Sequence, residues 1–281
     1  MEQLKRILKG AIDFHVHTSP DPYRERSVDA YTAALEARDL GMKAVVLKCH
    51  DYPTAPVART VDGLVKGIQV IGSIALNHGV GGVNPEAVDI SASMGARVIW
   101  MPTFSSIPDT KRRELDTGIS ILDEEGNLLP QTKQVIALAK KYELALCTGH
   151  ISRAEALALA DEAFAMNIRK LVITHPLTYA VGDPLPLEKQ KELADKGAYI
   201  EHCFVATTKE LGALDPKELV DAIRYVGIEK CMLSTDFGQK NNPKPAEGMK
   251  MMVETMLDSG LGEDELEVLL KRNPAMLLSL S

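Results

Sequence analysis

The chain has 281 residues, of which 45% are hydrophobic and 25% charged, the proportions of an ordinary globular protein. Its 39 acidic and 32 basic residues give a net charge of −7, which argues against nucleic acids and anionic membranes as main partners, because both select basic surfaces. The sequence has no apolar run near the roughly 18 residues of a membrane span and no apolar signal-peptide core at its start. The four cysteines form no CxxC pair, which is typical of reduced thiols. We therefore expect a cytoplasmic globular protein without nucleic-acid or membrane partners, either a monomer or a homo-oligomer.

Eight short apolar runs rich in β-branched residues follow one another along the chain, each leading into a polar turn. Runs of this length suit strands that are buried on both faces, as in a parallel sheet covered by helices. They are Ala11–His17, Lys43–His50, Ile68–Asn77, Ala96–Pro102, Leu144–His150, Lys170–Pro176, Ala198–Phe204 and Lys230–Phe237.

Segments with helical periodicity lie between these runs, and glycines or capping residues mark their ends. The clearest are Ser27–Leu40, Gln131–Tyr142, Arg153–Met166, Leu187–Lys196 and Pro216–Val226. Eight strand–helix units in a chain of this length predict an α/β fold, a closed (β/α)₈ TIM-like barrel, with an open doubly wound sheet as the alternative. We expect a single domain over residues 1–281, because the sequence contains no low-complexity tract and no linker.

The connection between the fourth and fifth runs is longer than the others. Within Thr103–Pro130, two apolar pairs flank Asp123–Asn127, which is the pattern of a β-hairpin. We therefore expect an insertion after strand 4 that covers one end of the barrel.

All seven histidines lie at or just beyond the C-terminal ends of predicted strands, and none falls in a predicted helix. They are His15, His17, His50, His78, His150, His175 and His202. The C-terminal rim is where (β/α)₈ barrels build their active sites, so this placement predicts a histidine-rich site.

The first strand carries the strongest pattern. Asp13, His15 and His17 alternate along it, so we expect all three side chains to point into the barrel. Two imidazoles at His-x-His spacing can bind one metal ion, and imidazoles with carboxylates suit Zn, Fe, Ni or Mn. Asp236, after the eighth strand, adds a carboxylate that can be both a ligand and a proton acceptor.

These motifs together resemble the amidohydrolase superfamily of metal-dependent (β/α)₈ hydrolases, over essentially the whole chain. Phe14-His15-Val16-His17 is similar to the superfamily's first-strand motif, Thr148-Gly149-His150 and Ile173-Thr174-His175-Pro176 to its fifth- and sixth-strand histidines, and Ser234-Thr235-Asp236 to its eighth-strand aspartate. The closing Asn273-Pro274-Ala275 resembles its C-terminal helix. The resemblance implies one or two divalent metals, zinc first, and a metal-activated water, with Asp236 as ligand and proton shuttle.

One feature departs from the superfamily pattern. Two-metal members carry a bridging carboxylated lysine or a glutamate at the end of strand four, where this chain has Ile99-Trp100-Met101-Pro102. Lys48 on strand two and Glu201 on strand seven are the nearest substitutes. Lys48 is either a carboxylated bridging ligand or a cation that pairs with Glu201 or with a substrate carboxylate, and the number of metals depends on which.

The sequence thus assigns catalysis to Asp236 and His175, the latter as ligand or as hydrogen-bond donor to the reacting oxygen. The metal candidates are His15, His17, His150, His175, Asp236, Lys48 and Glu201, and the substrate-binding candidates are Arg24, His50 and His78. We expect a metal-dependent hydrolase of a small amide, lactone, other ester or phosphoester. The alternatives are a decarboxylase with a similar metal site and a non-catalytic metal- or ligand-binding barrel.

Overall fold

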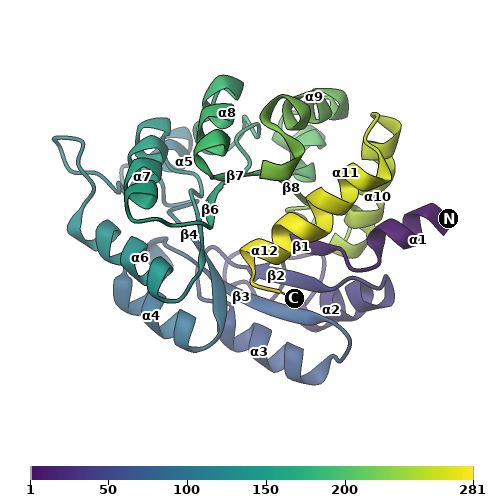
Figure 1. The fold of residues 1–281 in the computed structure, drawn as a ribbon. Coiled ribbons are helices and arrows are strands. Elements are labelled where there is room, and N and C mark those ends of the chain that lie inside the picture. Colours follow the sequence, from purple (N-terminus) through teal and green to yellow (C-terminus); the bar gives the residue numbers. More distant parts are fainter. Residues whose placement is uncertain (1, 281) are drawn as a thin grey trace.

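The structure is a computed structural model that describes residues 2–280, and its centre is one sheet of parallel strands (Figure 1). The strands pair in chain order from β1 to β8. Their bounds are β1 Ile12–His17, β2 Ala44–Lys48, β3 Gln69–Ala75, β4 Ala96–Trp100, β5 Ala145–Cys147, β6 Leu171–Ile173, β7 Tyr199–Cys203 and β8 Cys231–Ser234. Each predicted run contains one of these strands, although β5 and β6 are shorter than expected.

The sheet closes between its first and last strands just beyond the end of β8. Val16 and Phe237 form a parallel bridge, and the His17 amide donates to the Phe237 carbonyl at 2.8 Å. The Asp236 amide likewise donates to the His15 carbonyl at 3.0 Å. The (β/α)₈ barrel predicted from the sequence is therefore confirmed, and its seam runs beside the first-strand histidines.

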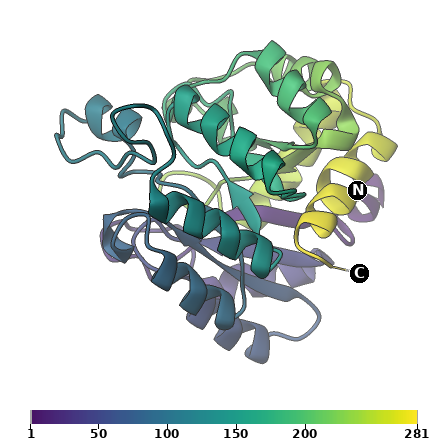
Figure 2. The same ribbon diagram turned by 60° about the vertical axis from the view of Figure 1, so that its left-hand side comes forward.

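Helices surround the barrel and connect successive strands (Figures 1 and 2). Their bounds are α1 Glu2–Leu8, α2 Ala30–Asp39, α3 Ala55–Leu64, α4 Pro85–Ser93, α5 Ile107–Arg112, α6 Pro130–Lys141, α7 Arg153–Ala165, α8 Leu187–Lys196, α9 Pro216–Val226, α10 Pro245–Asp258, α11 Glu263–Glu267 and α12 Asn273–Leu277. A π-helical turn, Val268–Arg272, joins the last two. Within residues 2–280, no helix combines the length and apolar character needed to cross a membrane.

Apolar side chains fill the barrel interior below the histidines. Phe14 and Trp100 meet edge to face, with ring centroids 6.4 Å apart. Leu277 and Leu278 pack into the same cluster, so α12 closes the N-terminal end of the barrel. The Asn273 side chain anchors this helix by donating to the Cys231 carbonyl at 2.6 Å, which gives the Asn-Pro-Ala motif a structural role.

The insertion after β4 is present and carries the expected hairpin. Leu122 and Leu128 form an antiparallel bridge around the turn, and Ser106 pairs with Ile119. The segment also contains α5, which the sequence interpretation did not identify. In Figure 2 the insertion projects at the left from the rest of the barrel.

The expectation that Asp13 points into the barrel is wrong. The register of β1 against β2 shifts between Asp13 and Val16, and this β-bulge lets the consecutive residues Phe14 and His15 both face the interior. Asp13 instead accepts hydrogen bonds from the amide and hydroxyl of Thr235, at 3.0 and 2.5 Å. It therefore ties β1 to the segment that carries Asp236.

Candidate metal centre

The C-terminal ends of the strands bring eight of the predicted site residues into one buried group. Each is at most 7% exposed: His15, His17, Lys48, His50, His150, His175, Glu201 and Asp236. Six of the eight strands contribute, since the set comes from the ends of β1, β2, β5, β6, β7 and β8.

At the seam, the Asp236 carboxylate lies close to one ring nitrogen of each first-strand histidine. His15 Nε2 and His17 Nε2 lie 3.2 and 3.1 Å from Asp236 Oδ1. Metal–ligand bonds of about 2.1 Å, at angles between octahedral and tetrahedral, place neighbouring ligand atoms about 3.0–3.4 Å apart. The types of ligand and the two histidine–aspartate distances therefore fit a divalent transition metal.

The protonation states of these groups also suit a cation. Burial lowers the pKa of both His15 and His17 to about 3, so both imidazoles are neutral. Burial alone would raise the pKa of Asp236, but the neighbouring His15 and His17 outweigh it and hold the pKa below its usual range. Neutral imidazoles and an ionised carboxylate are the ligand forms that bind metal.

The backbone around this group adopts conformations that residues other than glycine rarely adopt. Asp236 has φ of +53° and His175 has φ of +28°, and such strain is concentrated at functional sites in proteins. Gly238 lies so close to β1 that a Cβ there would be 1.7 Å from the His17 carbonyl oxygen. Only glycine permits this approach, which keeps His17 beside Asp236.

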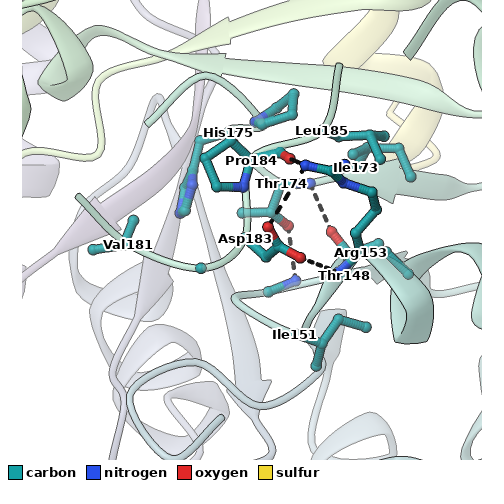
Figure 3. Close-up of a pocket in the computed structure, with 14 residues that line it drawn as sticks. Thr148, Ile151, Arg153, Ile173, Thr174, His175, Val181, Asp183, Pro184 and Leu185 are labelled. Carbon is teal, nitrogen blue, oxygen red and sulfur yellow. Dashed lines mark hydrogen bonds and ion pairs between the residues drawn. The ribbon is translucent and has the colours of Figure 1, made fainter. Parts of the chain in front are cut away.

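His150 and His175 form a second pair facing the first. Their Nε2 atoms are 3.2 Å apart, and the rings of His15 and His175 stack with centroids 6.0 Å apart. The other ring nitrogen of His150, Nδ1, lies 2.5 Å from Asp109 Oδ2. A small pocket adjoins His175, where Asp183 and Pro184 accept hydrogen bonds from Arg153 (Figure 3).

Lys48 and Glu201 flank His15 on opposite sides. Lys48 Nζ lies 2.8 Å from His15 Nε2, and Glu201 Oε1 lies 3.2 Å from His15 Nδ1. Burial lowers the pKa of Lys48 and raises that of Glu201 to about 7. Cys203 Sγ is 3.7 Å from His15 Nδ1 and joins His15 and Asp236 in a group able to hold an ion. Cys203 is not among the ligands expected from the sequence, although it alternates with Glu201 along β7.

The three substrate-binding candidates have different surroundings. His50 is buried in a stack between His17 and Phe104, with ring centroids 4.8 and 3.9 Å away. Arg24 lies at the rim, paired with Asp51 at 2.6 Å and with its guanidinium carbon 4.5 Å from the Phe104 centroid. His78 is exposed and its Nε2 lies 2.6 Å from the Thr117 carbonyl, so the structure does not bring it into the buried group.

Two further residues near the site come from the insertion. Asp109 is 3% exposed and contacts His150, and Arg113 has its guanidinium carbon 5.4 Å from the Phe104 centroid. Ser106-Ile107-Pro108-Asp109 has the pattern of a helix start, and Ser106 does cap the Asp109 amide. That signal could have identified α5, but nothing in it shows that Asp109 faces His150.

Fold and site define a (β/α)₈ barrel with a buried histidine–carboxylate centre at its C-terminal rim. The chain belongs to the family described as "Family of unknown function (DUF6282)", whose model matches residues 10–201. None of the curated proteins compared with the chain matches it in sequence.

Solved structures resemble this chain over nearly its full length. The probable dipeptidase PvdM from Pseudomonas aeruginosa is 12% identical, with TM-score 0.67 and coverage of 99% of this chain and 97% of that one. The lactonase Lmo2620 from Listeria monocytogenes is 14% identical, with TM-score 0.64 and coverage of 97% and 95%. A 2,6-dihydroxybenzoate decarboxylase from Rhizobium is 12% identical, with TM-score 0.55 and coverage of 96% and 99%. The resemblance to amidohydrolase-superfamily structures is therefore confirmed at the level of fold.

Proposed function

We propose that this protein is a metal-dependent hydrolase of small molecules, acting on an amide, a lactone or other ester, or a phosphoester. The observation that carries the proposal is the convergence of His15 Nε2 and His17 Nε2 on Asp236 Oδ1 at 3.1–3.2 Å. His150 and His175 complete the set of nitrogen donors around the same space. We further propose a cytoplasmic location without nucleic-acid or membrane partners, in keeping with the net charge of −7 and four free, buried cysteines.

A divalent ion held by these residues would supply a Lewis acid and a water of lowered pKa. Asp236 is placed to accept the proton of the attacking water, because its carboxylate is ionised and touches both first-strand histidines. It then returns that proton to the leaving group. His175 faces the same space, and as the alternative to ligating the ion it can donate a hydrogen bond to the oxygen on which charge develops.

We propose that the centre holds one ion rather than two, and that this ion is zinc. Trp100 occupies the end of β4, where two-metal relatives carry a bridging ligand, and it is fully buried. Lys48, which faces this ring, supplies as an amine no anionic ligand to bridge two metal ions. Fe, Mn or Ni satisfy the same donor set.

The substrate we propose carries an anionic group. Arg24 and Arg113 approach the Phe104 ring from two separate loops, and the stack of His17, His50 and Phe104 leads from the centre to this rim. Among the described residues, Arg113 donates only to backbone carbonyls, so its charge has no carboxylate partner. A guanidinium in this state suits a substrate carboxylate or phosphate.

Decarboxylation is the second candidate, and Lys48 is the observation that favours it. Within residues 2–280, no carboxylate lies within salt-bridge distance of Lys48 Nζ, which lies 4.9 Å from the Trp100 ring centroid. A substrate carboxylate beside His15 would supply the missing counter-charge.

The test begins with metal analysis of the purified protein, followed by assays of the zinc-loaded enzyme on matched panels. The panels contain amides, lactones, esters and phosphoesters, each with and without a carboxylate. Hydrolysis that requires the metal supports the proposal, and preference for the carboxylate-bearing members supports the assigned anion contact. Metal-dependent CO₂ release without hydrolysis would establish the decarboxylase instead. Failure to bind any divalent metal would overturn both enzyme functions.

A further inference from the structure

Asp109 joins three segments that meet at the candidate centre. Its Oδ2 lies 2.5 Å from His150 Nδ1 at the end of β5. Its Oδ1 accepts from the Gly182 amide, in the loop before α8, at 2.9 Å and from Arg112 Nη1, at the end of α5, at 2.6 Å. Both oxygens of the Asp109 carboxylate therefore have hydrogen-bonding partners within the protein.

These contacts fix which nitrogen of His150 carries the proton. An ionised carboxylate only accepts hydrogen bonds, so the nitrogen beside Asp109 must be Nδ1–H. In the neutral imidazole, Nε2 is then unprotonated and presents its lone pair toward the space shared with His175. A carboxylate that orients an imidazole in this way is the usual support of a metal-ligating histidine.

The loop before α8 also lies close to the His150 backbone. A Cβ on Gly182, where φ is +62°, would lie 3.3 Å from the His150 Cα. Arg112 Nη2 donates to the Gly182 carbonyl at 2.6 Å, so Arg112 and Asp109 hold both the carbonyl and the amide of this residue. The insertion and the loop before α8 are therefore bonded to each other beside His150.

We infer that Asp109 is the positioning residue of the centre: it sets the tautomer of His150 so that Nε2 is available as a ligand, and with Arg112 it locks the insertion onto the loop before α8. The inference rests on the proposed metal centre, but its primary consequence, the tautomer, is measurable without metal or substrate. Through Asp109, the insertion after β4 would help to orient a ligand of the metal centre.

The decisive variant is Asp109→Asn in the full-length protein. The two donors at Oδ1, Gly182 and Arg112, would hold the amide oxygen, which turns the NH₂ group toward His150 Nδ1. Because that group only donates, His150 must then carry its proton on Nε2. Nitrogen-15 NMR of the metal-free protein, with the His150 signals assigned by a His150→Gln variant, should show Nδ1–H in the wild type and Nε2–H in Asp109→Asn.

Zinc affinity, measured by competition with a chromophoric chelator, should fall about 10–100-fold in Asp109→Asn. Arg112→Gln leaves the carboxylate in place and should retain the Nδ1–H tautomer. Asp116→Asn, an exposed change in the same insertion, is the matched control and should alter neither readout.

An Nε2–H tautomer in the wild type would overturn the inference, even if Asp109→Asn failed to fold. An unchanged tautomer and zinc affinity in a folded Asp109→Asn variant would do so as well. Absence of zinc binding in the wild type would instead refute the proposed metal function, while leaving the tautomer result intact.

Discussion

Lys48 and Trp100 meet inside the barrel, with the lysine Nζ 4.9 Å from the indole centroid. Both side chains are at most 2% exposed, so the amine is held by the ring and by His15 Nε2 at 2.8 Å. The end of β4 is therefore occupied by an aromatic ring that faces a lysine, and neither side chain is a carboxylate.

This arrangement predicts that Lys48 is not a metal bridge. Lys48→Ala should keep one equivalent of zinc and lose activity, because the role proposed for the amine is to pair with a substrate carboxylate and not to ligate the ion. Lys48→Met, which keeps the volume of the side chain, separates loss of the amine from cavity formation. Two bound equivalents in the wild type, one of them lost in Lys48→Ala and restored by short carboxylic acids, would show a carboxylated bridge.

The two first-strand histidines should be necessary for metal retention. His15→Ala combined with His17→Ala removes both nitrogen donors that touch Asp236, so the purified double variant should contain no stoichiometric metal. Circular dichroism and thermal unfolding establish that it is folded. His78→Ala is the control, because His78 lies outside the buried group. Wild-type metal content in the double variant would refute the assigned ligands.

Asp236→Asn should reduce kcat about 10²–10⁴-fold, since an amide cannot accept a proton from water. Asparagine tolerates the left-handed backbone that this position adopts at φ of +53°, so the variant should fold normally. Measurement of kcat and KM in zinc-saturated protein separates loss of the proton acceptor from weakened metal binding. A kcat within a few-fold of the wild type would remove Asp236 from proton transfer.

The barrel and the identity of most site residues follow from sequence because both depend on local patterns. Strand periodicity and the placement of the histidines at strand ends predict where His150 and His175 converge. The orientation of Asp13 could not be predicted, since a β-bulge replaces strict alternation by a register shift set by pairing with β2. The contact of Asp109 with His150 depends on how the insertion folds over the rim, and no periodicity in the insertion encodes that.

The close approach of Gly238 to β1 allows a test of whether backbone packing at the seam sets the position of His17 relative to Asp236. Gly238→Ala places a Cβ 1.7 Å from the His17 carbonyl oxygen at φ of +122°, whereas Gly227→Ala introduces a methyl group at φ of +113° with no atom within 4 Å. Both variants incur backbone strain of about 1–3 kcal/mol. Gly238→Ala alone adds a steric overlap, so its free energy of unfolding should fall by about 1–3 kcal/mol more. Chemical denaturation measures both free energies, and zinc affinity should drop only in Gly238→Ala, because only that change displaces His17 from Asp236. Equal destabilisation of the two variants with unchanged zinc affinity would show that the seam does not determine the geometry of the centre.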